Sequence, residues 1–143
     1  MKKSFVIILL AFSLILSAFP VYAAGESSLE GDIVISPNYT YIMLLHAGLT
    51  INSSGKAQCV GGVDASSNSY DAELTVSLQK YENGSWKSVK SWSDSGTGQS
   101  NLLIDEPYYV VRGTYRVRTT ARIFDRLGKL LESASLNSDE VTY

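Results

Sequence analysis

The sequence is poor in the residues from which most catalytic and metal sites are built, because it contains one cysteine and one histidine. A single cysteine excludes a disulfide framework within the chain, and without carboxylates the pair cannot complete a transition-metal site. An acid–base or nucleophilic site would have to use His46, which lies in an apolar stretch with no signalled partner. We therefore expect no enzyme activity, no metal and no cofactor; a small hydrolase that uses His46 is the catalytic alternative.

Long hydrophobic runs are also scarce. The most apolar one, Phe5–Phe19, is shorter than the roughly 20 residues that a membrane-spanning helix needs. Lys2 and Lys3 precede it, and Val21-Tyr22-Ala23 matches a small-x-small cleavage site. These features predict a secretory signal peptide over residues 1–23, a single domain over 24–143, and release to the extracellular space.

Neither sign of charge dominates, with 12 basic and 14 acidic residues in the chain. Removal of Lys2 and Lys3 with the signal peptide makes the mature protein more acidic. An acidic protein outside the cell is a poor partner for nucleic acid, and no membrane contact is expected after cleavage. The expected partners are a cell-wall polysaccharide or a surface protein, and we expect a monomer.

Helical periodicity is absent, and apolar residues instead recur with a period of two. In the clearest segment Leu74, Val76 and Leu78 alternate with polar residues, which is typical of a half-buried strand. Turn signals recur every 8 to 12 residues, a spacing typical of a sandwich or barrel. The pattern predicts about seven or eight strands, with a bend at Gly48 and an interruption at Pro107. The predicted strands cover 32–36, 39–51, 56–65, 72–81, 86–93, 101–104, 114–125 and 129–136.

Two local patterns refine the expected fold. Asn83-Gly84 predicts a tight hairpin turn, because both residues tolerate positive φ angles. Tyr115 stands where immunoglobulin-like and fibronectin-like sandwiches carry their tyrosine corner. Cys59 would then lie on the strand that bears the first core cysteine, with Val117 in the place of its partner. We therefore predict an all-β, immunoglobulin-like or fibronectin-like sandwich in which Cys59 is either buried or free to form an intermolecular disulfide.

Several stretches between about residues 50 and 135 resemble a family of small, signal-peptide-bearing secreted bacterial β-sandwich proteins whose function is unknown. The resemblance implies an exported single β-sandwich domain, and it implies no activity and no site residues. The stretches that carry it are Gly55-Lys56-Ala57-Gln58-Cys59, Leu78-Gln79-Lys80, Asn83-Gly84-Ser85-Trp86, Lys90-Ser91-Trp92, Tyr115-Arg116-Val117 and Gly128-Lys129-Leu130-Leu131-Glu132-Ser133.

Aromatic residues supply the first candidate site. Trp86 and Trp92 are six residues apart on one predicted strand, so an unbroken alternation places them on one face with Ser88 and Lys90 between them. Tyr81 lies across the hairpin and could extend an aromatic strip that stacks on sugar rings. The alternative is that one tryptophan fills the core and the other caps its rim, with a bulge between them that turns Val89 inward.

Arginines supply the second candidate. Arg116, Arg118 and Arg122 share one face of a strand, within a basic segment, and could bind an anionic polymer. They could equally pair with carboxylates on neighbouring strands or keep that face soluble. Together these residues predict a secreted, non-catalytic protein that binds cell-surface glycan or cell wall. The alternative is a protein–protein interaction or envelope-structural module that uses a sheet edge or the arginine-rich face.

Overall fold

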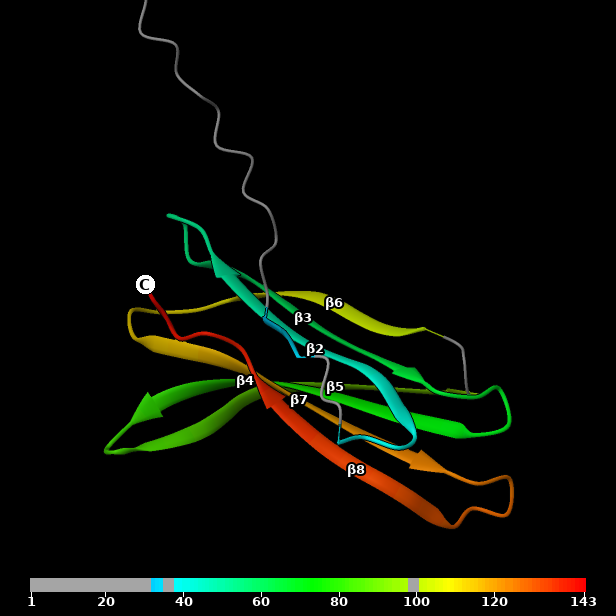
Figure 1. The fold of residues 1–143 in the computed structure, drawn as a ribbon. Helices are drawn as coiled ribbons and strands as arrows, with labels where there is room; N and C mark the ends of the chain where they lie inside the picture. The colour runs from blue at the N-terminus through cyan, green and yellow to red at the C-terminus, as the bar shows by residue number, and fades with distance from the viewer. Residues whose placement is uncertain (1–31, 35–37, 98–100) are drawn as a thin grey trace, which may run out of the picture.

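The computed structural model describes residues 32–34, 38–97 and 101–143, and it forms two antiparallel β-sheets packed face to face (Figure 1). The described residues contain no helix, so none could cross a membrane as a long apolar helix. The predicted signal peptide, residues 1–23, lies outside the described residues. The all-β sandwich expected from the alternation is confirmed.

The described residues form nine strands, two of them only two and three residues long. One sheet has the order β1-β2-β3-β6, and the other has the order β5-β4-β7-β8 with β9 paired to β7. This order follows the immunoglobulin-like scheme, with β5 in the place of the extra strand of variable-type domains. The strands are β1 Asp32–Val34, β2 Ile42–Ile51, β3 Lys56–Ala65, β4 Asp71–Glu82, β5 Ser85–Thr97, β6 Leu102–Tyr109, β7 Thr114–Phe124, β8 Leu130–Asn137 and β9 Val141–Thr142.

The core lies between the two sheets and is built from alternate residues of each strand. The alternation predicted for Leu74, Val76 and Leu78 is confirmed, because all three are buried. The central strands contribute the side chains of Leu45, Ala57, Cys59, Val63, Leu74, Val76, Leu78, Tyr115, Val117, Thr119, Ala121 and Ile123. Gly61 completes the inner face of β3, where a Cβ atom would lie 2.3 Å from Val76 Cγ2 and 2.5 Å from Thr119 Oγ1.

The tyrosine corner is present. The Tyr115 hydroxyl donates a hydrogen bond to the Val111 carbonyl oxygen at 2.8 Å, and the ring is 2% exposed. Cys59 and Val117, the positions of the immunoglobulin disulfide, are both fully buried. Burial, with a smaller contribution from the charge of Asp105, raises the pKa of the Cys59 thiol to about 12. The thiol therefore stays protonated at neutral pH, and the thiolate is the reactive species. Cys59 thus packs as a small, unreactive apolar residue.

The hairpin turn is confirmed, with positive φ angles of 53° at Asn83 and 77° at Gly84. Two other expectations were wrong. β2 runs without a bend at Gly48 and is irregular only between Ile42 and Leu44. β6 continues through Pro107, because β6 is an edge strand and the missing N–H removes no hydrogen bond when it faces away from the sheet.

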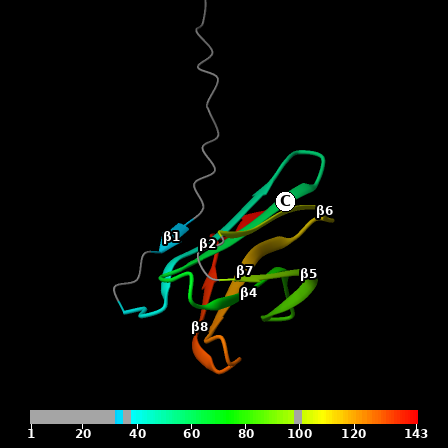
Figure 2. The ribbon, with the colours of Figure 1, turned by 90° about the vertical axis from the view of Figure 1, so that its right-hand side faces the viewer.

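The sandwich has two lateral sides (Figure 2). On one side β2 lies beside β8, and on the other β5 lies beside β6. The carboxylate of Glu132 on β8 joins the first pair by accepting backbone N–H bonds from Thr40, Tyr41 and Ile42 at 3.1, 2.8 and 2.9 Å. This contact fixes the start of β2 to the opposite sheet.

Candidate functional site

The outward face of the β5-β4-β7-β8 sheet is almost entirely polar, and we call it the polar face. Its members are the residues that alternate with the buried positions, and the strand register sets them in cross-strand rows. They are Trp86, Ser88, Ser91, Ser93 and Ser95 on β5, Glu73, Thr75, Ser77, Gln79 and Tyr81 on β4, Arg116, Arg118, Thr120 and Arg122 on β7, and Ser133, Ser135 and Asn137 on β8.

A β-bulge separates the two tryptophans. Leu78 pairs with Lys90 while Gln79 pairs with Ser88, so Val89 is an extra residue that shifts the alternation of β5. Trp86 pairs with Tyr81 on the polar face, whereas Trp92 pairs with Val76 on the buried face. The prediction that the two tryptophans share a face was therefore wrong, since it assumed an unbroken strand.

Trp92 belongs to the interior edge of the sandwich. It is partly buried, packs against the core, and meets the Tyr108 ring edge-on at 6.4 Å between centroids. The alternative with a bulge correctly described one tryptophan against the core. Val89 itself remains 41% exposed, so it turns inward only as far as a recess at the rim.

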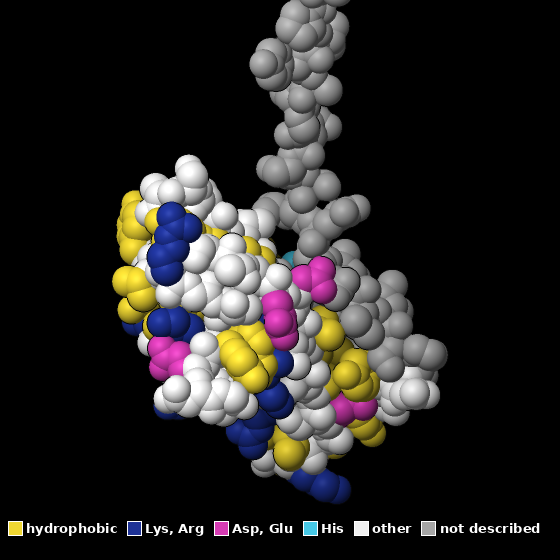
Figure 3. Space-filling view, turned by 90° about the vertical axis from the view of Figure 1, so that its left-hand side faces the viewer, with side chains coloured by type: hydrophobic (Ala, Val, Ile, Leu, Met, Phe, Trp, Pro, Cys, Tyr) yellow, Lys and Arg dark blue, Asp and Glu magenta, His cyan; other side chains and the backbone are white. Residues whose placement is uncertain are grey.

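Tyr81, Trp86 and Arg116 form a cluster at the hairpin end of the polar face, with the two rings tilted by 55°. The Tyr81 and Trp86 ring centroids are 5.2 Å apart, and the Arg116 guanidinium carbon lies 4.2 Å from the Trp86 ring. Arg116 Nε also donates to Gln79 Oε1 at 2.9 Å, which fixes the arginine over the ring. Tyr81 stays 48% exposed. Viewed from this end, the sandwich presents hydrophobic and basic side chains side by side (Figure 3).

Hydroxyl pairs cover the middle of the polar face. Ser77 and Ser91 lie 2.7 Å apart, Thr75 and Ser93 3.0 Å, and Thr120 and Ser135 2.9 Å. These cross-strand hydrogen bonds hold the hydroxyl groups in fixed rows. Their signal in the sequence is the alternation of Ser and Thr residues along β4 and β5.

The three arginines share the polar face, as predicted, but their environments differ. Arg122 forms an ion pair with Glu73 at 3.0 Å and covers the Phe124 ring at 4.9 Å. Arg116 is held by Gln79 and Trp86. Arg118 has no ion pair, side-chain hydrogen bond or ring contact with any described residue and is exposed. The expected pairing with carboxylates of the chain thus applies to one arginine.

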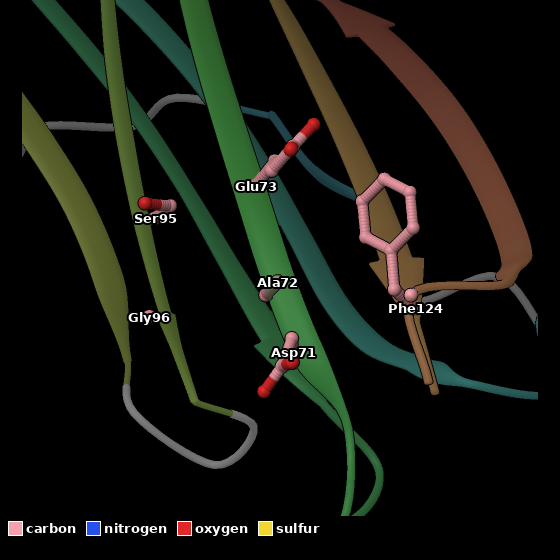
Figure 4. A pocket seen from close by; sticks show the side chains of 7 residues that line it. Asp71, Ala72, Glu73, Ser95, Gly96 and Phe124 are labelled. Atoms are coloured by element: carbon pink, nitrogen blue, oxygen red, sulfur yellow. The ribbon is translucent and has the colours of Figure 1, made fainter. Parts of the chain in front are cut away.

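A shallow depression of ≈ 520 Å³ lies at the other end of the polar face. Asp71, Glu73, Ser95 and Phe124 line it, and the two carboxylates point in different directions (Figure 4). They do not form the facing pair that glycoside hydrolysis requires. Within 32–34, 38–97 and 101–143 no three His, Cys, Asp or Glu side chains are grouped to hold a metal ion.

His46, the only histidine, lies on β2 in the other sheet, between Ile33 and Gly62 in the register. Its Nδ1 atom is buried without a hydrogen-bond partner among the described residues. It is therefore remote from the polar face, which contains all the other candidate residues except Trp92.

No protein-family model matches the chain, and no curated protein matches it. The resemblance to secreted bacterial β-sandwich proteins therefore stays a prediction.

Proposed function

We propose that the protein is a secreted, non-catalytic binding module that holds an extended glycan of the cell surface or cell wall on the polar face. The observation that carries this proposal is the cluster of Tyr81, Trp86 and Arg116 beside rows of ordered hydroxyl groups. Tyr81 is exposed and Trp86 is half-buried beside it, so part of a large aromatic surface stays in contact with water. A ligand that covers this surface recovers the cost of exposing it.

The chemistry of the polar face matches that of a sugar chain. Aromatic rings pack against the apolar C–H face of a pyranose, while hydroxyl and amide groups exchange hydrogen bonds with its hydroxyls. The Ser and Thr hydroxyls and the amides of Gln79 and Asn137 supply both donors and acceptors. The face is a broad sheet with only shallow depressions, whereas small-molecule sites are usually concave. An extended polymer fits it better than a small molecule.

Co-sedimentation of the purified protein with insoluble cell wall and polysaccharides tests the proposal. We expect the wild-type protein to sediment and Trp86→Ala to lose most of its binding while keeping its circular dichroism spectrum. Trp92→Ala is the matched control: it removes the same side chain from the opposite face of the same strand, so it should lower stability and keep binding. Absence of sedimentation with every polymer, or equal loss in both variants, would rule out this site.

The alternative function is a protein-interaction module. It is favoured by a recess of ≈ 280 Å³ at the β5–β6 side, where Tyr109 and Val111 are 71% and 69% exposed. Pairing of a partner strand along the edges themselves is disfavoured, because β6 contains Pro107 and β5 contains the Val89 bulge. If the protein is a protein-interaction module, Val111→Asp should abolish binding of the protein partner. If it is a glycan-binding module, the same substitution should leave glycan binding unchanged.

A further inference from the structure

We infer that the ligand of the polar face is an acidic polymer and that Arg118 binds its anionic groups. This inference rests on the proposed function and specifies the ligand of the same site. It follows from the difference between Arg118 and its two neighbours on β7, Arg116 and Arg122.

The flanking arginines are already engaged within the protein. Arg116 covers the Trp86 ring and donates to Gln79, and Arg122 is paired with Glu73. Arg118 lies between them on the same face and has no partner within the described chain. Its guanidinium therefore retains its full set of donors for a ligand.

The surroundings of Arg118 favour an anion. Its cross-strand neighbours are Ser77 on β4 and Asn137 on β8, which can add neutral hydrogen bonds to a bound oxyanion. The rows of Thr75, Ser77 and Gln79 contain two arginines and no carboxylate. Like charges on one strand face repel each other, so a bound anion would stabilise this arrangement.

The strand register also sets a minimum length for the ligand. Ser77, the neighbour of Arg118, lies four residues along β4 from Tyr81, which corresponds to about 13 Å at roughly 3.3 Å per residue. A ligand that stacks on Tyr81 and Trp86 and also reaches Arg118 must therefore be a chain of several sugars. A carboxylate, sulfate or phosphate group would meet the planar guanidinium through two parallel hydrogen bonds.

The test compares polymers that share a backbone and differ in charge, namely dextran and dextran sulfate, with polygalacturonate as a carboxylate and poly(glycerol phosphate) as a phosphate. We expect binding of at least one anionic polymer in preference to dextran. Arg118→Gln should weaken that binding about tenfold or more. Arg118→Lys should restore only part of it, because an ammonium cannot form the bidentate contact.

Arg126→Gln is the matched control, because it removes the same charge from an exposed turn outside the polar face. Equal losses in Arg118→Gln and Arg126→Gln would show general charge attraction and overturn the inference. Binding that depends on Trp86 but is equal for dextran and its sulfate, or is unaffected by Arg118→Gln, would overturn it and leave the proposed function intact. If no polymer and no cell wall binds to the protein, both this inference and the proposed function are wrong.

Discussion

The two faces of the β5-β4-β7-β8 sheet are made by the same strands and yet differ completely in chemistry. The inner face carries Leu74, Val76 and Leu78 on β4, each fully buried, whereas the polar face carries Thr75, Ser77 and Gln79 from the positions between them. Stability therefore depends on one set of alternate residues, and the binding proposed above depends on the other. Neighbouring residues on one strand can be substituted to separate the two roles.

Leu78 and Ser77 give the largest expected contrast. Leu78→Ala removes a fully buried side chain and leaves a cavity, so we expect it to lower the free energy of unfolding by about 2–5 kcal/mol. Ser77→Ala removes one hydroxyl pair on the polar face and should change it by about 0.5 kcal/mol or less. Urea denaturation of both variants measures the difference. Equal effects would contradict the assignment of the two faces.

Substitution of Gly61 on β3 tests how closely its sheet packs against the inner face of the β5-β4-β7-β8 sheet. A Cβ atom there would overlap Val76 and Thr119, both fully buried. We expect Gly61→Ala to lower the free energy of unfolding by about 1–3 kcal/mol. Gly62→Ala is the control, because its Cβ would meet no atom closer than 3.4 Å. Thermal unfolding of the two variants should show the larger loss for Gly61.

Thr119 and Thr120 are adjacent residues on opposite faces. The Thr119 hydroxyl is buried without a hydrogen-bond partner among the described residues, whereas that of Thr120 pairs with Ser135. Thr119→Val should therefore raise the free energy of unfolding by about 1–2 kcal/mol, because it removes an unsatisfied polar group. Thr120→Val should not stabilise the protein. A destabilised Thr119→Val variant would show that the hydroxyl has a partner after all.

Cys59 extends the comparison to the facing sheet and predicts the smallest effect. The pKa of the Cys59 thiol is raised to about 12 in the folded protein, above its value in the unfolded chain. The buried neutral thiol therefore contributes fully to the free energy of unfolding below about pH 9. That contribution is lost as pH rises towards 12, because the unfolded chain loses its thiol proton first. At about pH 9.5 the loss should be about 1 kcal/mol relative to Cys59→Ala. Urea denaturation of the two proteins at neutral and alkaline pH isolates this difference from other titrating groups.

A thiol reagent provides a second measurement on Cys59. The folded protein should react slowly at neutral pH, and the protein unfolded in urea should react at once. Rapid labelling of the folded protein, or a disulfide-linked dimer, would contradict the buried position.

Most of the fold could be predicted from the sequence, because alternation and turn residues act over short distances. The inward sets on β3, β4 and β7, the Asn83-Gly84 turn and the tyrosine corner all follow from such local patterns. The interruption expected at Pro107 was wrong because the cost of proline depends on whether the strand lies at an edge. Strand order decides that, and sequence spacing does not contain it.

The candidate site was predictable only in part. The alternation of residues along β7 predicted that the three arginines share one face, and the hairpin turn predicted that Tyr81 lies near Trp86. Both predictions held because no bulge lies within either stretch. The position of Trp92 could not be predicted, because one extra residue at Val89 reverses every side chain beyond it. Nor could the sequence show that Arg118, of the three arginines on β7, is the one without a partner among the described residues, because its neighbours are engaged by residues 30 to 50 positions away in the chain.

That this chain forms strands, where most of them turn, and which residues face the core in the strands without a bulge could be predicted from the sequence, because these depend on local backbone preferences and burial. The packed structure sets which strands pair, which tryptophan lies on the polar face and which of the three arginines has no partner among the described residues. Those outcomes depend on register between distant segments, and register is set only when the two sheets close around a shared core.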